Sequence, residues 1–408
     1  MTDSHSNTII IPTAHQMPPS GWQPGFTSCF MLSVRNTGPD TIVVTHVSHE
    51  FMLDGKATGV KGESLCALHI SPFSANAWEH NPVFFPAELA SKASEKQISL
   101  QITAFGTAAG KPVFGCCCMP VIRSDLPETL HRHIGAKTAL ELMPSHCARI
   151  SNMPEILGFL DRAYDAMADL SGQRPLNGEC MALRESPPFF AWARAGFPIL
   201  LNTTHVCNSV EAFDRGVVCF GWLHEMGHNF EYGYWYMYNS PACEFHANFK
   251  LVYAIEHLIN GNSDGFHLLE WEKNPDPERK YDNGRLWVDS KFNPDSCSYL
   301  SDTSREWETM DSNDLLVFYL ALVRKHGWDP FKRMYRTYRS LSFATDERPV
   351  LNSSNEMFSL QMAILSYLID DDIRAHCADW RIPLSEDTVQ SLSARFDLPV
   401  HTSRFCDC

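Results

Sequence analysis

The sequence predicts an α+β protein, with a β-sandwich-like domain over residues 1–125 and a mainly α-helical domain over residues 126–408. Three observations predict this class. Short alternating or β-branched runs in the first third are separated by clusters of Gly, Pro, Asn and Asp. Apolar residues in the remainder recur at helical spacing. A length of 408 residues with 44% hydrophobic residues suits two or three domains with filled cores.

Three segments of the first third have the pattern of strands, namely residues 28–35, 41–47 and 97–105. Several short strands of this kind favour a sandwich. The triplet Cys116–Cys118 falls on a further predicted strand, where alternate side chains face opposite sides. A Ser-Asp-Leu-Pro tract at residues 124–127 marks the predicted domain boundary.

The second domain shows helical periodicity from its first long segment, residues 154–170, where Ile156, Leu160 and Met167 share one apolar face. Further helices are predicted at residues 216–231, 243–259, 311–325, 329–340 and 355–367. Residues 260–302 are rich in Gly, Asn, Asp and Pro, which predicts a long surface loop. Residues 126–305 form the predicted active-site part, and residues 306–408 the helical C-terminal part.

Composition and charge exclude several functional classes. The net charge of −15 argues against a nucleic-acid binder, whose phosphate contacts need a basic surface. The longest apolar runs are too short to span a membrane. The first residues lack the basic and apolar regions of a signal peptide, so we expect a cytoplasmic chain or one exported by a signal-independent route, with secretion as the alternative. The sequence leaves the oligomeric state open.

The segment His-Glu-Met-Gly-His at residues 224–228 carries the chemistry. On a helix, His224 and His228 lie one turn apart on the same face, so both imidazoles can reach one ion. Glu244 opens the next helical pattern, and a carboxylate from a second helix is a usual third zinc ligand. Glu225, beside the first histidine, can take a proton from water and pass it to a leaving amine. The pattern predicts one Zn²⁺ per chain; the alternative is a helix with two satisfied core histidines.

These motifs resemble those of the enhancin-like zinc metallopeptidases, a gluzincin group (peptidase family sixty of the metallopeptidases) that includes mucin-degrading enzymes. The signature of that family looks like His-Glu-x-Gly-His-Asn followed by Glu-x-x-x-Asn, which here is residues 224–229 and then Glu244 with Asn248. Further matching segments lie at residues 195–199, 326–331 and 380–385, so the resemblance covers about residues 150–395.

The resemblance implies a gluzincin-type zinc endopeptidase fold and activity. It places His224, His228 and Glu244 on zinc and makes Glu225 the general base and acid. The expected substrate is a protein or glycoprotein, and the mucin-degrading members extend this to O-glycosylated, mucin-type proteins.

Five other residues are candidates for the substrate or for support of the ligands. Asn229 and Asn248 either orient ligands or make hydrogen bonds within the fold. Tyr232 and Tyr236 follow the predicted zinc helix and either donate a hydrogen bond to an oxyanion or pack as ordinary aromatics. Glu231 is either an acceptor for the second N–H of a metal-bound imidazole or a solvated surface carboxylate.

Two functional alternatives remain open at this point. One is a non-catalytic binding protein whose zinc site is structural or vestigial and whose β-rich domain engages a partner. The other is a zinc hydrolase that acts on a bond other than a peptide bond with the same ligands.

Overall fold

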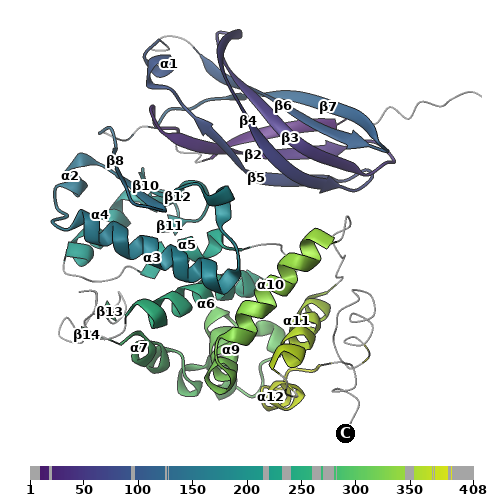
Figure 1. The fold of residues 1–408 in the computed structure, drawn as a ribbon, viewed down its shortest axis with the longest axis vertical. Helices are drawn as coiled ribbons and strands as arrows, with labels where there is room; N and C mark the ends of the chain where they lie inside the picture. The colour runs from purple at the N-terminus through teal and green to yellow at the C-terminus, as the bar shows by residue number, and fades with distance from the viewer. Residues whose placement is uncertain are drawn as a thin grey trace, which may run out of the picture. The chain divides into compact units, whose positions relative to one another are not determined.

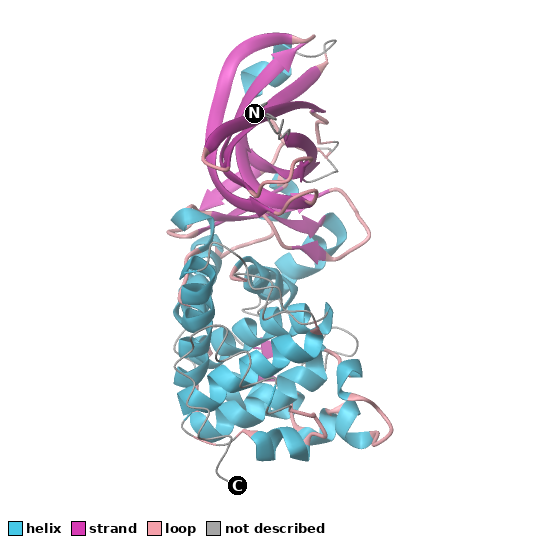
Figure 2. Ribbon diagram, turned by 90° about the vertical axis from the view of Figure 1, so that its right-hand side faces the viewer, coloured by secondary structure: helices cyan, strands magenta, loops and turns pink. Residues whose placement is uncertain are grey.

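The computed structural model describes residues 10–17, 21–92, 97–124, 126, 128–214, 220–231, 240–259, 268–269, 280–281, 283–344, 353–369, 371, 373–384 and 387. The chain forms two compact units, each described by itself below. The first comprises residues 1–133, 139–149 and 181–208, and the second comprises residues 134–138, 150–180 and 209–408. The mixed α+β class is confirmed, because antiparallel sheets come first in the chain and a helical region follows (Figure 2). The predicted division at residue 125 stays a prediction.

Two antiparallel sheets form the N-terminal part of the first unit (Figure 1). One has the order β1 (Ile10–Met17), β2 (Thr27–Asn36), β5 (Ala75–Phe84), and the other has the order β4 (Lys56–Ile70), β3 (Ile42–Leu53), β6 (Ile98–Ala108), β7 (Lys111–Pro120). A short helix, α1 (Ala87–Lys92), precedes β6. The three predicted strands correspond to β2, β3 and β6.

Alternation along the strands explains why these two sheets share one core. In β2, Phe30, Leu32 and Val34 are fully buried, and they belong to the same hydrophobic cluster as Ile42 and Val44 of β3. The triplet Cys116–Cys118 lies on strand β7, with its first and third members exposed and the middle one half-buried. That alternation is the one predicted for a strand.

A further sheet in the first unit was not predicted. Its strand order is β11 (Ala193–Arg194), β12 (Ile199–Asn202), β10 (Met181–Ser186), β9 (Thr138–Leu142), β8 (His131–Ile134), and β10 runs parallel to β12. Every residue of β9 and β10 is buried. Strands buried on both faces carry no polar–apolar alternation, so the periodicity that identified the first strands had no signal here.

Helices make up most of the second unit, and the predicted ones are present with shifted ends. They are α3 (Met153–Ser171), α5 (Phe220–Asn229), α6 (Ser240–Leu258), α9 (Ser312–His326), α10 (Asp329–Ala344) and α11 (Ser354–Ile369). Three further helices are α2 (Pro144–Cys147) in the first unit, α4 (Thr203–Asp214), which begins in the first unit and ends in the second, and α12 (Arg374–Asp379) in the second. Local chemistry fixes several ends: Asp311 caps α9 through the backbone N–H groups of Asn313 and Asp314, and Gly172 ends α3 in the left-handed conformation.

The long surface loop predicted for residues 260–302 is wrong in its second half. The structure places α7 (Gly284–Lys291) and α8 (Ser298–Ser301) there, with the short strand pair β13 (Leu268–Leu269) and β14 (Lys280–Tyr281) before them. The side chain of Asn283 accepts a hydrogen bond from the Leu286 amide at 3.0 Å, so this residue caps a helix. Asn and Asp favour caps as well as loops, which explains the error. Among the described residues, no helix is long and apolar enough to cross a membrane.

Candidate metal centre

Two helices of the second unit, α5 and α6, carry the candidate metal ligands (Figure 1). Helix α5 buries Trp222, Leu223 and Met226, which leaves the face with the two histidines only partly buried. At the crossing, a Cβ placed on Gly227 would lie 2.5 Å from the carbonyl oxygen of Ala247. The absence of a side chain therefore lets the two backbones approach closely enough for the carboxylate of Glu244 on α6 to reach both imidazoles.

Three electron-donating atoms converge between these helices, one each from His224, His228 and Glu244. The two Nε2 atoms are 3.1 Å apart, and the Oε2 atom of Glu244 lies 3.1 Å from the first and 3.6 Å from the second. Zinc bonds of about 2.0–2.1 Å in a tetrahedron separate neighbouring ligand atoms by about 3.3 Å. The three atoms thus have the spacing of one face of a tetrahedral site.

The outer nitrogens of both rings have acceptors, and this determines what the inner nitrogens present. His224 Nδ1 lies 2.7 Å from Asn248 Oδ1, and His228 Nδ1 lies 3.0 Å from Glu231 Oε1. Carboxylate and amide oxygens accept hydrogen bonds, so each Nδ1 carries the proton and donates it. Each Nε2 then presents a lone pair, and two lone pairs with a carboxylate oxygen at these distances repel one another unless a cation lies among them. The residues present fit a metal ion.

Electrostatics at the site also favours a cation. Burial disfavours the charged form of His228, but hydrogen bonds with Cys243, Glu231 and Glu244 outweigh it and raise the pKa of His228 to about 12. Hydrogen bonds with the two histidines hold the pKa of Glu244 well below its usual range. The anionic surroundings that stabilise a proton here stabilise a divalent ion in the same way.

A second group of possible ligands shares one histidine with the first: His228, Glu231 and Cys243. The Cys243 sulfur lies 3.8 Å from His228 Nδ1 and 3.7 Å from Glu231 Oε2. Two features oppose an ion there. The Nδ1 atom already donates its proton to Glu231, and the ammonium of Lys250 lies 4.0 Å from that carboxylate. We therefore assign this second group as support for the first site.

Comparison with known proteins gives distant relatives, and no family model matches the chain. A TRPM8 channel-associated factor homolog from Danio rerio is 22% identical over 209 residues, which are 50% of this chain and 20% of that protein. A homolog of the same name from Xenopus laevis is 24% identical over 266 residues, 63% of this chain and 26% of that protein. The chain is distantly homologous to the channel-associated factors. It spans about a quarter or less of the length of these curated relatives.

These relatives overturn the family assignment made from sequence motifs. The resemblance to the enhancin-like and mucin-degrading gluzincins is wrong as an assignment, because the curated proteins that match are channel-associated factors. The mucin-type substrate rested on that resemblance and is withdrawn with it. The physical reason is that the spacing of two histidines on a helix face is set by helix geometry, so it indicates metal chemistry without specifying a family.

Two solved structures show weaker likenesses. A functionally unknown conserved protein from Bacillus anthracis str. Ames aligns over 95% of this chain and 79% of its own, with 11% identity and a TM-score of 0.48. Aminopeptidase A from Legionella pneumophila aligns over 87% of this chain and 47% of its own, with 10% identity and a TM-score of 0.35. Similarity to a peptidase is thus weak, and neither likeness carries an argument about activity.

The remaining candidates from sequence have mixed outcomes. Asn248 contacts His224 and Glu231 contacts His228, as given above, while Asn229 ends α5 and Glu225 lies partly buried beside the first histidine. Tyr232 and Tyr236 lie outside the described residues. The catalytic and binding roles stay predictions. Cys243 and Lys250 were not predicted as site residues, although the helical pattern of residues 243–259 contains both.

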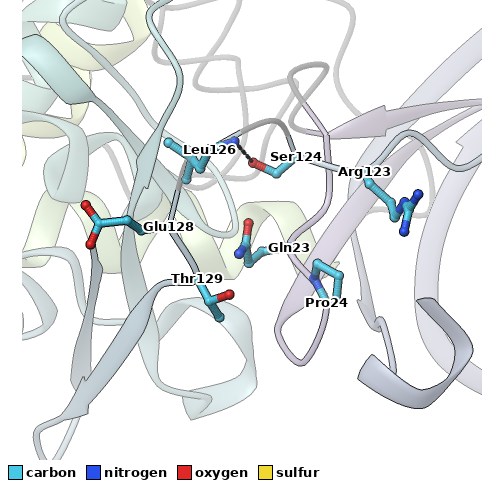
Figure 3. Close-up of a pocket in the computed structure, with 7 residues that line it drawn as sticks. All are labelled: Gln23, Pro24, Arg123, Ser124, Leu126, Glu128 and Thr129. Atoms are coloured by element: carbon cyan, nitrogen blue, oxygen red, sulfur yellow. Dashed lines mark hydrogen bonds between the residues drawn. The ribbon is translucent and has the colours of Figure 1, made fainter. Parts of the chain in front are cut away.

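A cavity of about 590 Å³ in the first unit is lined by Gln23, Pro24, Arg123, Ser124, Leu126, Glu128 and Thr129 (Figure 3). Its lining has one carboxylate and no histidine or cysteine. Size alone does not mark a site of chemistry, whereas converging ligand atoms do. We therefore place the candidate site between α5 and α6.

Substituting Gly227 by Ala tests whether the helix crossing builds the site. The added methyl group would meet the Ala247 carbonyl at 2.5 Å, so the helices must separate. We expect a loss of about 1–3 kcal/mol in the free energy of unfolding, with weakened zinc affinity. Urea unfolding of the metal-free chain and chelator competition measure the two effects. A variant with unchanged zinc affinity would show that the close approach is not needed.

Proposed function

We propose that the chain is a zinc-dependent endopeptidase. The observation that supports this most is the convergence of two Nε2 lone pairs and a carboxylate oxygen on α5 and α6, with Glu225 next to the first of them along the helix. Two imidazoles and one carboxylate are a ligand set that zinc uses in hydrolytic enzymes.

Exposure favours a catalytic site over a structural one. The side chains of His224 and His228 are each 14% exposed, and that of Glu244 is 50% exposed. Structural zinc sites are closed by four protein ligands, whereas catalytic sites keep a position for water or substrate. Three described ligands, two partly buried and one half-exposed, match the second kind.

Each residue then has a defined task. His224, His228 and Glu244 hold the ion, and the hydrogen bonds from the two histidines to Asn248 and Glu231 fix the orientation of the rings. When bound, zinc acts as a Lewis acid that makes water acidic near neutral pH and polarises a substrate carbonyl. Glu225 accepts the proton of the attacking water and delivers it to the leaving amine.

The proposal is tested by incubating the full chain with a panel of unfolded proteins and peptides. We expect cleavage that stops with a zinc chelator and returns when zinc is added. Identification of new N-termini by mass spectrometry confirms that peptide bonds are cut. A chain that binds zinc but cleaves no member of the panel would contradict the proposal.

A second candidate function is non-catalytic association with a membrane channel. The distant relatives are named as TRPM8 channel-associated factors, and that name is what favours it. On this reading zinc supports the fold only, so a chain that holds zinc and captures a channel without any hydrolysis distinguishes it from the first.

A further inference from the structure

We infer that Lys250 is a positioning residue for the metal ligand His228 and acts through Glu231. The inference rests on the proposed metal site and deepens it. It identifies a buried cation two residues from Asn248 on α6 whose place in the site no sequence motif indicated.

Lys250 is held with its ammonium fully inside the protein. Its side chain is 0% exposed, and Nζ donates a hydrogen bond to the backbone carbonyl of His246 at 3.1 Å. The ring of Tyr335, from α10, lies 5.3 Å from the ammonium. Because the Lys250 side chain is completely buried, its ammonium cannot reach water as the ammonium of a surface lysine does.

A buried ammonium requires a compensating charge, and Glu231 provides it. Its Oε1 atom lies 4.0 Å from Nζ, and the same oxygen accepts the Nδ1–H of His228 at 3.0 Å. Tyr335 supplies no negative charge, since burial raises the pKa of its hydroxyl well above the usual value and this hydroxyl lies 2.8 Å from His246 Nδ1. Lys250 therefore contacts Glu231, and Glu231 contacts His228, which is one of the proposed metal ligands.

This series of contacts explains how Glu231, whose side chain is only 11% exposed, can stay in a position that orients the imidazole of His228. A mostly buried carboxylate can be kept in its position when a nearby cation offsets its charge. With Lys250 beside it, Glu231 directs its oxygen at His228 and fixes the lone pair of Nε2 toward the ion. Partners of this kind affect metal affinity by about 10–100-fold.

The test compares full-length variants by zinc affinity, measured by competition with a chromophoric chelator, and by the visible spectrum of the cobalt-loaded chain. We expect Lys250→Met and Glu231→Gln each to weaken zinc binding by about 10–100-fold and to change the cobalt spectrum. The double variant should bind zinc no more weakly than Glu231→Gln alone, because Lys250 acts only through that carboxylate.

Lys332→Met is the matched control, since that lysine is in the same unit and pairs with Asp169 at 2.7 Å. It should leave zinc affinity and the cobalt spectrum unchanged. If Lys250→Met fails to fold in thermal unfolding of the metal-free chain, Lys250→Gln serves in the same comparison. Unchanged affinity in the lysine variant, or losses that multiply in the double variant, would overturn the inference.

A further variant separates this inference from the proposed function. His224→Ala should abolish zinc binding at the site. If zinc affinity is the same in His224→Ala as in the parent chain, the metal site itself is wrong. If His224→Ala loses zinc while Lys250→Met keeps it, the site stands and the role of Lys250 fails.

Discussion

Replacing Glu225 by Gln is expected to abolish peptide hydrolysis while zinc stays bound. The amide keeps the shape of the side chain but cannot accept the proton of the attacking water. Loss of a general base and acid typically costs about 10²–10⁴-fold in rate. The measurement is kcat/KM on a cleaved peptide together with zinc content per chain.

Zinc content distinguishes a lost base from a lost site in that experiment. The three residues that converge on the metal position do not include Glu225, so its variant should hold one zinc per chain as the parent does. Glu308→Gln is the control, since Glu308 is an exposed glutamate in the same unit. Hydrolysis at the parental rate in Glu225→Gln would rule out this residue as the base.

Replacing Glu244 by Ala is expected to remove zinc and activity together. The Oε2 atom of this residue contacts both histidines, so its loss leaves two ligands on a single helix. Affinity should fall by more than about 100-fold, because loss of a supporting partner alone already costs 10–100-fold. Zinc that binds only the folded chain also raises the unfolding temperature, and this rise should disappear.

The unfolding temperature is measured with and without zinc in parent and variant. An equal rise in both would mean that zinc binds elsewhere. The metal-free parent and variant are compared as a control for general destabilisation. Half of the Glu244 side chain is exposed, so its truncation should change the stability of the metal-free protein little.

Periodicity predicted those elements that have one face in the core and one outside. Strands such as β2 and helices such as α3 are of this kind. Apolar residues recur at alternate positions in the strand and at helical spacing in the helix. Strands β9 and β10 are buried on both sides, and α7 is capped by Asn283, a residue type also common in loops, so the same patterns failed there. A periodic pattern of apolar residues cannot reveal a strand that is buried on both faces.

The candidate site divides in the same way. The two histidines and Glu225 follow from the geometry of one helix, and Glu244 from the pattern of the next. The contact of Glu231 with His228 also follows from local spacing, since Glu231 lies three residues after that histidine. The burial of Lys250 depends on how α6 and α10 pack, which no local spacing encodes. The structure brings the ligand atoms of the three predicted residues together, whereas the family suggested by the motif was wrong.

The most direct measurement is peptide hydrolysis by metal-free protein as zinc is added in known amounts. We expect activity to rise in proportion to zinc and to stop rising at one zinc per chain, while Glu225→Gln binds the same amount and stays inactive. Activity that is independent of zinc, or a chain that saturates with one zinc and cleaves nothing, would contradict this expectation.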